Sequence, residues 1–155
     1  MKLEFFFVGK TSESFLKNGV DEYLKRLKHY IPVTEIMIEP SRFSKTDAKK
    51  SIAEESEKML KKIKPADFIV VLDERGKSLA SEELAVLLEK HQQSGTQKMI
   101  FITGGAYGFS DAVRQRANLL LSFSKFTFTH QMIRLLLAEQ VYRAMTILKN
   151  EKYHH

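Results

Sequence analysis

The sequence contains no cysteine, which excludes a disulfide framework and thiolate metal sites and agrees with a reducing compartment. It also lacks a long apolar run. The N-terminal segment MKLEFFFVGK has an apolar stretch of only a few residues, interrupted by Glu4, which is too short for a signal peptide or a membrane span. We therefore expect a soluble cytoplasmic protein with no membrane partner.

The motifs of metal and nucleophilic chemistry are missing as well. Neither H-x-x-x-H nor H-E-x-x-H occurs, and there is no G-x-S-x-G nucleophile elbow. The histidines show no ligand spacing with one another or with acids; they are His29, His91, His130, His154 and His155. We expect no metal.

The overall composition is that of an ordinary globular protein, with 43% hydrophobic and 28% charged residues. Its 155 residues predict a single domain over 1–155. The net charge is +6, with a local basic cluster at Arg42, Lys45, Lys49 and Lys50 that only Asp47 opposes. Such a cluster can bind RNA phosphates, and a solvated basic face explains it equally well.

Strand and helix patterns alternate along the whole chain. Short apolar runs predict strands at 3–8, 34–39, 68–73, 99–103 and 119–122. Apolar residues at helical spacing predict helices that begin near 14, 47, 81, 110 and 131, with Ser81 as the cap of the third. Residues 74–77 read as a turn. This alternation predicts an α/β fold, a parallel sheet covered by helices on both faces.

Ligands of such sheets bind beyond the carboxyl ends of the strands, where three loops leave this sheet. Gly104-Gly105-x-x-Gly108 follows one predicted strand, a position where glycines let backbone N–H groups approach a ligand. The spacing is not that of a dinucleotide fingerprint, and a tight structural turn is as good an interpretation. Leu72, at the end of another strand, reads as a core leucine.

The third loop is unusually aromatic. Phe123, Phe126 and Phe128 alternate with polar residues, although loops are usually polar and exposed. We expect this loop to be covered, to wrap a flat ligand and to pack beneath the last helix.

The last helix, 131–149, is apolar on nearly every side and leaves a narrow polar strip of Glu139, Arg143 and Thr146. A helix of this kind is buried on more than one side. In a chain this short, a second copy of the protein can supply the second surface, so we expect a homodimer.

Long segments also match a known family. The sequence ITGGAYGF at 102–109, then LLLSFSKFTFTHQMIRLLLAEQVYRA at 119–144 and the tail KYHH, resembles the RlmH family. These are small SPOUT-class methyltransferases that modify a pseudouridine of large-subunit ribosomal RNA. The resemblance covers the whole chain. One departure is His155, where the family pattern has a basic residue.

The resemblance implies a SPOUT methyltransferase fold whose C-terminal part forms a deep trefoil knot, an obligate homodimer, and S-adenosyl-L-methionine as cofactor. The implied target is N3 of a pseudouridine, in the assembled 70S ribosome or its large subunit. The residues implied to bind the cofactor are Leu72, Gly104, Gly105, Phe123, Ser124, Lys125, Phe126, Thr127 and Phe128. The residues implied for catalysis are Glu139, Arg143, Tyr153 and His154.

Methyl transfer from this cofactor requires alignment of the reacting atoms and removal of the N3 proton. We expect His154 to be the base, because histidine titrates near neutral pH, and Arg143 to hold an RNA phosphate or to orient the base. Two alternatives are a non-catalytic RNA-binding protein that uses its basic surface, and an oxidoreductase whose Gly104–Gly108 loop holds a pyrophosphate.

Overall fold

Five strands form one parallel sheet in the computed structural model, which describes residues 1–153. The strands are β1 Lys2–Val8, β2 Val33–Ile38, β3 Phe68–Ser78, β4 Lys98–Ile102 and β5 Leu119–Ser122. Their order in the sheet is β2-β1-β4-β3-β5, and every neighbouring pair is parallel.

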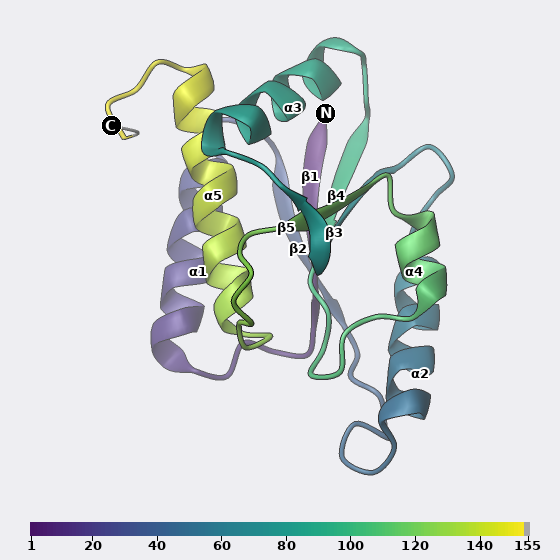
Figure 1. The fold of residues 1–155 in the computed structure, drawn as a ribbon. Helices are drawn as coiled ribbons and strands as arrows, with labels where there is room; N and C mark the ends of the chain where they lie inside the picture. Colours follow the sequence, from purple (N-terminus) through teal and green to yellow (C-terminus); the bar gives the residue numbers. More distant parts are fainter. Residues whose placement is uncertain (154–155) are drawn as a thin grey trace.

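Five helices cover the two faces of this sheet (Figure 1). They are α1 Ser14–Leu27, α2 Ala48–Leu60, α3 Ser81–Gln93, α4 Asp111–Arg116 and α5 Met132–Leu148. Helices α1, α3 and α5 lie on one face and α2 and α4 on the other, each with its own apolar cluster. The predicted parallel sheet with helices on both faces is confirmed. No helix within residues 1–153 is long and apolar enough to cross a bilayer.

The apolar runs form strands because alternate side chains enter the two clusters. Phe5 and Phe7 pack toward α1, α3 and α5, whereas Phe6 packs toward α2 and α4. The Phe5 ring stacks on Phe101 of β4 with the centroids 5.5 Å apart. Each fully buried side chain of this size stabilises the fold by about 1.5–3 kcal/mol. The sheet is therefore a rigid base for the loops at its ends.

The turn predicted at residues 74–77 is wrong, because β3 continues through it to Ser78. The extension pairs with β5, with a shift in register between Leu72 and Lys77. At Gly76, a Cβ would lie 2.5 Å from the carbonyl carbon of Leu120, so only glycine lets the two backbones approach this closely. Pairing between distant segments has overridden the local turn signal.

The predicted cap of α3 is also wrong. Ala80 precedes the helix, and its backbone N–H donates to the Glu83 side chain at 2.8 Å. The Ser81 hydroxyl instead donates to Gln140 of α5 at 3.0 Å. Ser81 therefore joins two helices and does not cap one.

Helix α5 packs against both α1 and α3, so much of its apolar surface is buried within one chain. A second copy of the protein is therefore not needed to bury this surface, and the homodimer stays a prediction. Thr146, predicted to lie in a polar strip, is fully buried and donates to the Arg143 carbonyl at 2.7 Å. The largest buried side chain is one that the helical pattern did not reveal, Arg134, with no exposed surface.

Candidate functional site

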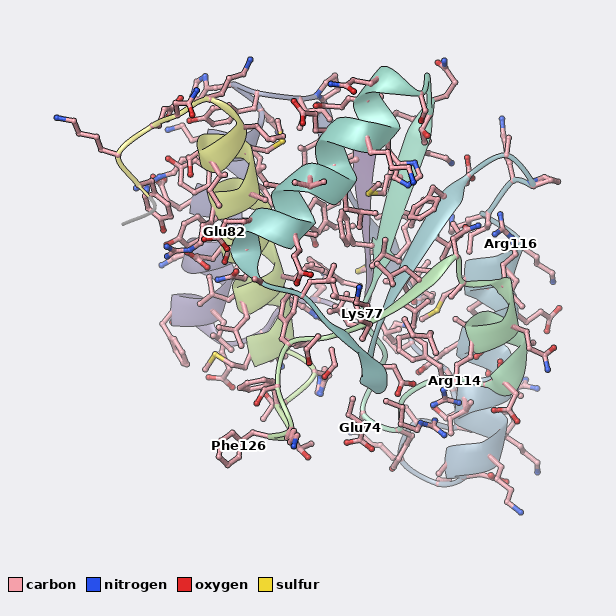
Figure 2. The ribbon with its side chains drawn as sticks, turned by 45° about the horizontal axis from the view of Figure 1, so that its top comes forward. Glu74, Lys77, Glu82, Arg114, Arg116 and Phe126 are labelled. Carbon is pink, nitrogen blue, oxygen red and sulfur yellow. The ribbon has the colours of Figure 1, made fainter. Side chains whose placement is uncertain are left out.

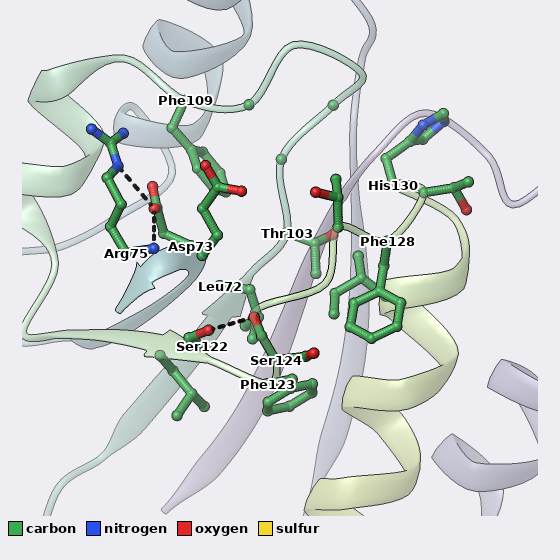
Figure 3. A pocket seen from close by; sticks show the side chains of 18 of the residues that line it. Leu72, Asp73, Arg75, Thr103, Phe109, Ser122, Phe123, Ser124, Phe128 and His130 are labelled. Atoms are coloured by element: carbon green, nitrogen blue, oxygen red, sulfur yellow. Dashed lines mark hydrogen bonds and ion pairs between the residues drawn. The ribbon is translucent and has the colours of Figure 1, made fainter. Parts of the chain in front are cut away.

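The carboxyl ends of β3, β4 and β5 surround a cavity of about 590 Å³ (Figure 3). This volume is in the range of small-molecule sites. Of the nine residues predicted to bind a cofactor, eight line the cavity: Leu72, Gly104, Gly105, Phe123, Ser124, Phe126, Thr127 and Phe128. Lys125 is exposed and is not part of the lining. The strand-end rule thus located the cavity, and the binding role of these residues stays a prediction.

The glycine loop that follows β4 has structural needs of its own. The Gly108 N–H donates to the Gly105 carbonyl at 3.2 Å, and Gly108 has a φ of +82°. A Cβ on Gly104 would lie 3.0 Å from the Gly108 Cα. The tight-turn interpretation of this loop is confirmed. The loop also forms one wall of the cavity, and its role in ligand binding stays a prediction.

Thr103, just before this loop, lines the cavity and is fully buried. Its hydroxyl has no hydrogen-bond partner among the described residues. A buried hydroxyl without a partner destabilises the fold by about 1–3 kcal/mol. This free hydroxyl is a group that a ligand can satisfy.

The aromatic loop after β5 is only partly covered. Phe123 is half-buried, but Phe128 is 38% exposed and Phe126 is 82% exposed, so the expectation of cover is wrong for Phe126. Figure 2 shows the Phe126 side chain extending outward from the loop. The Ser124 hydroxyl accepts from the Phe126 N–H at 2.9 Å and fixes the local backbone. The loop is ordered by its own polar residues, while its aromatic rings stay available.

A charged wall, missed at the sequence level, stands opposite the aromatic loop. Asp73 lies at 2.7 Å from the Arg114 Nε and accepts from the Arg75 N–H at 3.0 Å. Burial raises the pKa of Asp73, but hydrogen bonds from Arg114 and Arg75 outweigh it, so the pKa lies below its ordinary value. Arg114 also donates to the Phe109 carbonyl at 2.8 Å. The ionised Asp73 thus anchors the segment that closes the glycine loop.

The start of α5 is fastened to the end of β1. Arg134 donates to the carbonyl oxygens of Val8 and Gly9 and to the Thr11 hydroxyl. Burial lowers the pKa of His130, which lines the cavity, and the charge of Arg134 lowers it further. His130 is consequently a neutral donor or acceptor in the cavity wall near pH 7.

Three of the four predicted catalytic residues lie together. Glu139 accepts from the Arg143 Nη2 at 2.7 Å, and the Tyr153 hydroxyl lies 3.1 Å from the same carboxylate oxygen. The Tyr153 hydroxyl also lies 3.2 Å from that of Tyr23, and the Arg143 guanidinium stands 4.9 Å from the centroid of the Tyr153 ring. The fourth, His154, lies outside the described residues.

This tail cluster, Glu139, Arg143 and Tyr153, is separate from the cavity, since none of the three lines it. Burial raises the pKa of Tyr153, and the hydrogen bond with Tyr23 raises it further. Tyr153 therefore stays protonated at neutral pH and can serve as a hydrogen-bonding group but not as a base.

Comparisons with known proteins identify the family of this chain. The sequence profile of a family described as "Predicted SPOUT methyltransferase" matches residues 1–154. The chain is 43% identical to a protein of Syntrophotalea carbinolica and 45% identical to one of Geobacter metallireducens, over 100% of this chain and 99% of each relative. Both relatives are named "Ribosomal RNA large subunit methyltransferase H".

A solved structure shares the fold. It is described as a probable methylase family protein from Haemophilus influenzae Rd KW20, with a TM-score of 0.55 at 12% identity, over 99% of this chain and 70% of that one. The resemblance inferred from the ITGGAYGF and LLLSFSKFTFTHQ segments is confirmed: the chain belongs to the SPOUT methyltransferase family.

Proposed function

We propose that this protein transfers a methyl group from S-adenosyl-L-methionine to ribosomal RNA of the large subunit, at N3 of a pseudouridine. The observation that carries the proposal is the cavity at the ends of β3, β4 and β5 in a chain of this family. Relatives at 43–45% identity over the full length carry a name that states the same reaction class.

The cavity suits this cofactor. Adenine is flat and apolar on its faces, and the half-buried Phe123 and the partly exposed Phe128 offer apolar surface to it. The free Thr103 hydroxyl and the backbone of the glycine loop offer hydrogen-bonding groups to its polar edges. When bound, S-adenosyl-L-methionine supplies an electrophilic methyl group on a sulfonium.

The chain's own residues must then hold the target base and take up its N3 proton. Tyr153 cannot accept this proton, because its pKa is raised, which leaves His154 as the base that we propose. Glu139 keeps Arg143 oriented through two hydrogen bonds, at 2.7 and 3.1 Å, so that Arg143 can hold a phosphate or orient the base.

The separation of the tail cluster from the cavity supports a homodimer in which the cavity of one protomer faces the tail of its partner. Tyr153 is held on α1 and α5 by Tyr23 and Glu139, whereas the cavity lies at the other end of α5. Within residues 1–153, the tail cluster and the cavity of one chain therefore do not meet. A mixed dimer of a tail variant and a cavity variant tests this, since it should regain one working site.

We further propose that the segment from β5 onward is threaded through the preceding chain as a deep trefoil knot. The close approach of Gly76 to the Leu120 backbone, together with α5 packed between α1 and α3, supports this. Crystallographic tracing of residues 70–148 tests the proposal. A path of α5 that passes through no loop would refute it.

Two measurements test the function itself. Calorimetry should detect binding of S-adenosyl-L-methionine and of S-adenosylhomocysteine but not of NAD, which an oxidoreductase would bind. Mass spectrometry of large-subunit RNA from cells without the protein should show loss of one methyl group from a pseudouridine. An unchanged RNA would refute the target, and a protein that binds RNA but no cofactor would favour the non-catalytic alternative.

A further inference from the structure

A basic surface lies at the same end of the sheet as the cavity. The segment that leaves the carboxyl end of β2 and enters α2 carries Arg42, Lys45, Lys49 and Lys50, and all four side chains are exposed. We call this set the basic loop. Because all five strands are parallel, the loops after β2, β3, β4 and β5 project from one edge (Figure 1).

The buried Glu55 of α2 connects the basic loop to the cavity. One carboxylate oxygen of Glu55 accepts from the Ser41 N–H at 3.1 Å and from the Ser51 hydroxyl at 3.3 Å. The other faces the glycine loop, 2.7 Å from the position of a Cβ on Gly105. Next to it, the Ser110 N–H donates to the Ser56 hydroxyl at 3.1 Å. Glu55 therefore joins the basic loop to the glycine loop in the cavity wall.

The basic loop is also internally ordered. Ser41 at its base donates to Glu54 at 2.6 Å and accepts from the Phe43 N–H at 3.0 Å. The ring of Phe43 holds two cations, the Arg42 guanidinium at 4.8 Å and the Lys50 ammonium at 5.4 Å from its centroid. Cations held in place in this way lose less side-chain entropy when they bind a partner.

The charges of the basic loop are left largely unpaired. Lys50 has a long contact of 3.6 Å with Asp47, and Arg42, Lys45 and Lys49 have no ion pair within residues 1–153. Further along the same helix, Lys58 and Lys61 pair with Glu54 and Glu57 at 2.8 and 2.6 Å. The uncompensated positive charge of α2 is thus concentrated at the end next to the cavity.

We propose that the basic loop binds the phosphate backbone of the substrate RNA. In this proposal Glu55 holds the basic loop at a fixed distance from the cavity. This proposal rests on the proposed function, and it names the surface that holds the RNA. Phosphates on the basic loop would place the neighbouring nucleotides over the glycine loop, where the exposed Tyr107 lines the cavity. RNA is the partner because a row of exposed cations complements a polyanion.

The test compares two charge-reversal pairs. Lys45→Glu/Lys49→Glu changes the basic loop, and Lys28→Glu/Lys62→Glu changes two exposed lysines that follow α1 and α2 at the opposite edge of the sheet. Each pair lowers the net charge from +6 to +2. Equilibrium binding to large ribosomal subunits and to whole ribosomes from cells without the protein is measured at several salt concentrations, with S-adenosyl-L-methionine binding measured in parallel.

We expect the basic-loop pair to weaken binding to the ribosomal particle on the order of tenfold and to lower the salt slope by about 1.4, or about 0.7 for each lost phosphate contact. We expect the opposite-edge pair to change affinity less than about twofold. Equal losses of binding affinity in both pairs would mean that net charge alone causes the effect. No loss of affinity in the basic-loop pair would mean that the RNA binds elsewhere. Either result overturns the proposal.

Cofactor binding keeps the two proposals apart. If the wild-type protein binds no S-adenosyl-L-methionine, the proposed function fails, while the comparison of the two charge pairs still decides whether the basic loop holds RNA. If both pairs bind the cofactor as the wild type does, a loss of particle binding in the basic-loop pair is assigned to the RNA grip alone.

Discussion

The two ends of the sheet differ in whether their buried polar groups have hydrogen-bond or ion-pair partners. At the amino-terminal end, Lys98 lies 3.0 Å from Asp67 and 3.4 Å from Glu4, and Lys2 lies 2.9 Å from the same Glu4. Arg116 also donates to three backbone carbonyl oxygens of the segment 64–67. Charges that are largely buried there have partners.

At the carboxyl end, paired groups such as Asp73 stand beside polar and aromatic groups that have no partner. Within residues 1–153, two buried side-chain polar atoms lack a hydrogen bond, the Thr103 hydroxyl and the Arg134 Nε. Thr103 lines the cavity, and Arg134 lies against the end of β1 beside it. Phe126 and Tyr107 expose their rings at the same cavity.

The difference separates stability from binding. Paired charges stabilise one end of the sheet, whereas the unpaired Thr103 hydroxyl at the other end destabilises the fold until a ligand bonds to it. The comparison predicts that substitutions at the amino-terminal end change stability alone, and that those at the cavity end change binding as well.

Arg134→Ala should have the largest effect. It removes the partner of the Val8 and Gly9 carbonyl groups and of the Thr11 hydroxyl, so we expect the free energy of unfolding to fall by about 3–5 kcal/mol. Urea denaturation measures this, with Arg134→Lys as a control that keeps the charge but loses the planar fork. A loss below about 0.5 kcal/mol would show that Arg134 does not fasten α5 to β1.

Lys98→Met should lower stability by about 2–3 kcal/mol, because Asp67 and Glu4 then share a poorly solvated site without their cation. The affinity for S-adenosyl-L-methionine should stay within about twofold of the wild type at a temperature where both proteins are folded. A tenfold loss of cofactor affinity would contradict the separation of the two ends.

Gly105→Ala should act mainly on binding. The new methyl group meets the Glu55 carboxylate at 2.7 Å and must displace the glycine loop or the carboxylate. We expect calorimetry to show cofactor affinity reduced about tenfold, or about 1.4 kcal/mol. Gly95→Ala is the matched control, because no atom lies within 4 Å of its Cβ position, although its φ of +78° adds some strain. Equal affinities in the two variants would argue against a role of the glycine loop.

Asp73→Asn should lower the free energy of unfolding by about 1.5 kcal/mol at pH 7, and this loss should depend on pH. The pKa of Asp73 is lowered in the folded state, so its stabilising effect is present above the unfolded pKa, about 3.9, and is lost as the pH falls through the folded pKa. The difference in unfolding free energy between wild type and variant should thus be full at pH 7 and shrink below about pH 4. A difference that does not vary with pH would contradict this assignment.

Phe126→Ala should have the smallest effect on stability, within about 0.5 kcal/mol, because the ring is 82% exposed. If the ring contacts the cofactor or the RNA, binding of one of them weakens measurably while thermal unfolding is unchanged. Phe15→Ala provides the control, since Phe15 is 63% exposed on α1 and does not line the cavity. Identical binding by both variants would show that Phe126 is exposed without a role in binding.

The sequence predicted the features that depend on local pattern. Continuous apolar runs such as FIVVL are typical of central parallel strands, and the alternation with helices then places three loops at one edge of the sheet. Of the nine residues that this geometry and the family resemblance proposed for the cofactor, eight line the cavity.

Features that depend on distant partners were not predictable in this way. The β3 extension contains Glu74, Arg75 and Gly76 and looks like a turn until β5 pairs with it. Arg134 reads as a polar residue of an apolar helix, and only the position of the β1 carbonyl groups makes it the most buried charge. The contact of Asp73 with Arg114 joins residues 41 positions apart.

The contact between Arg134 and Val8 has a consequence for the order in which the protein can assemble. It joins residues 126 positions apart in the chain, so it can form only after the last helix has been synthesised. Contacts of such long sequence separation form slowly. A chain that ends before residue 134 contains all five strands but lacks the side chain that fastens α5 to β1, so we expect it to bind no cofactor until the last helix is present.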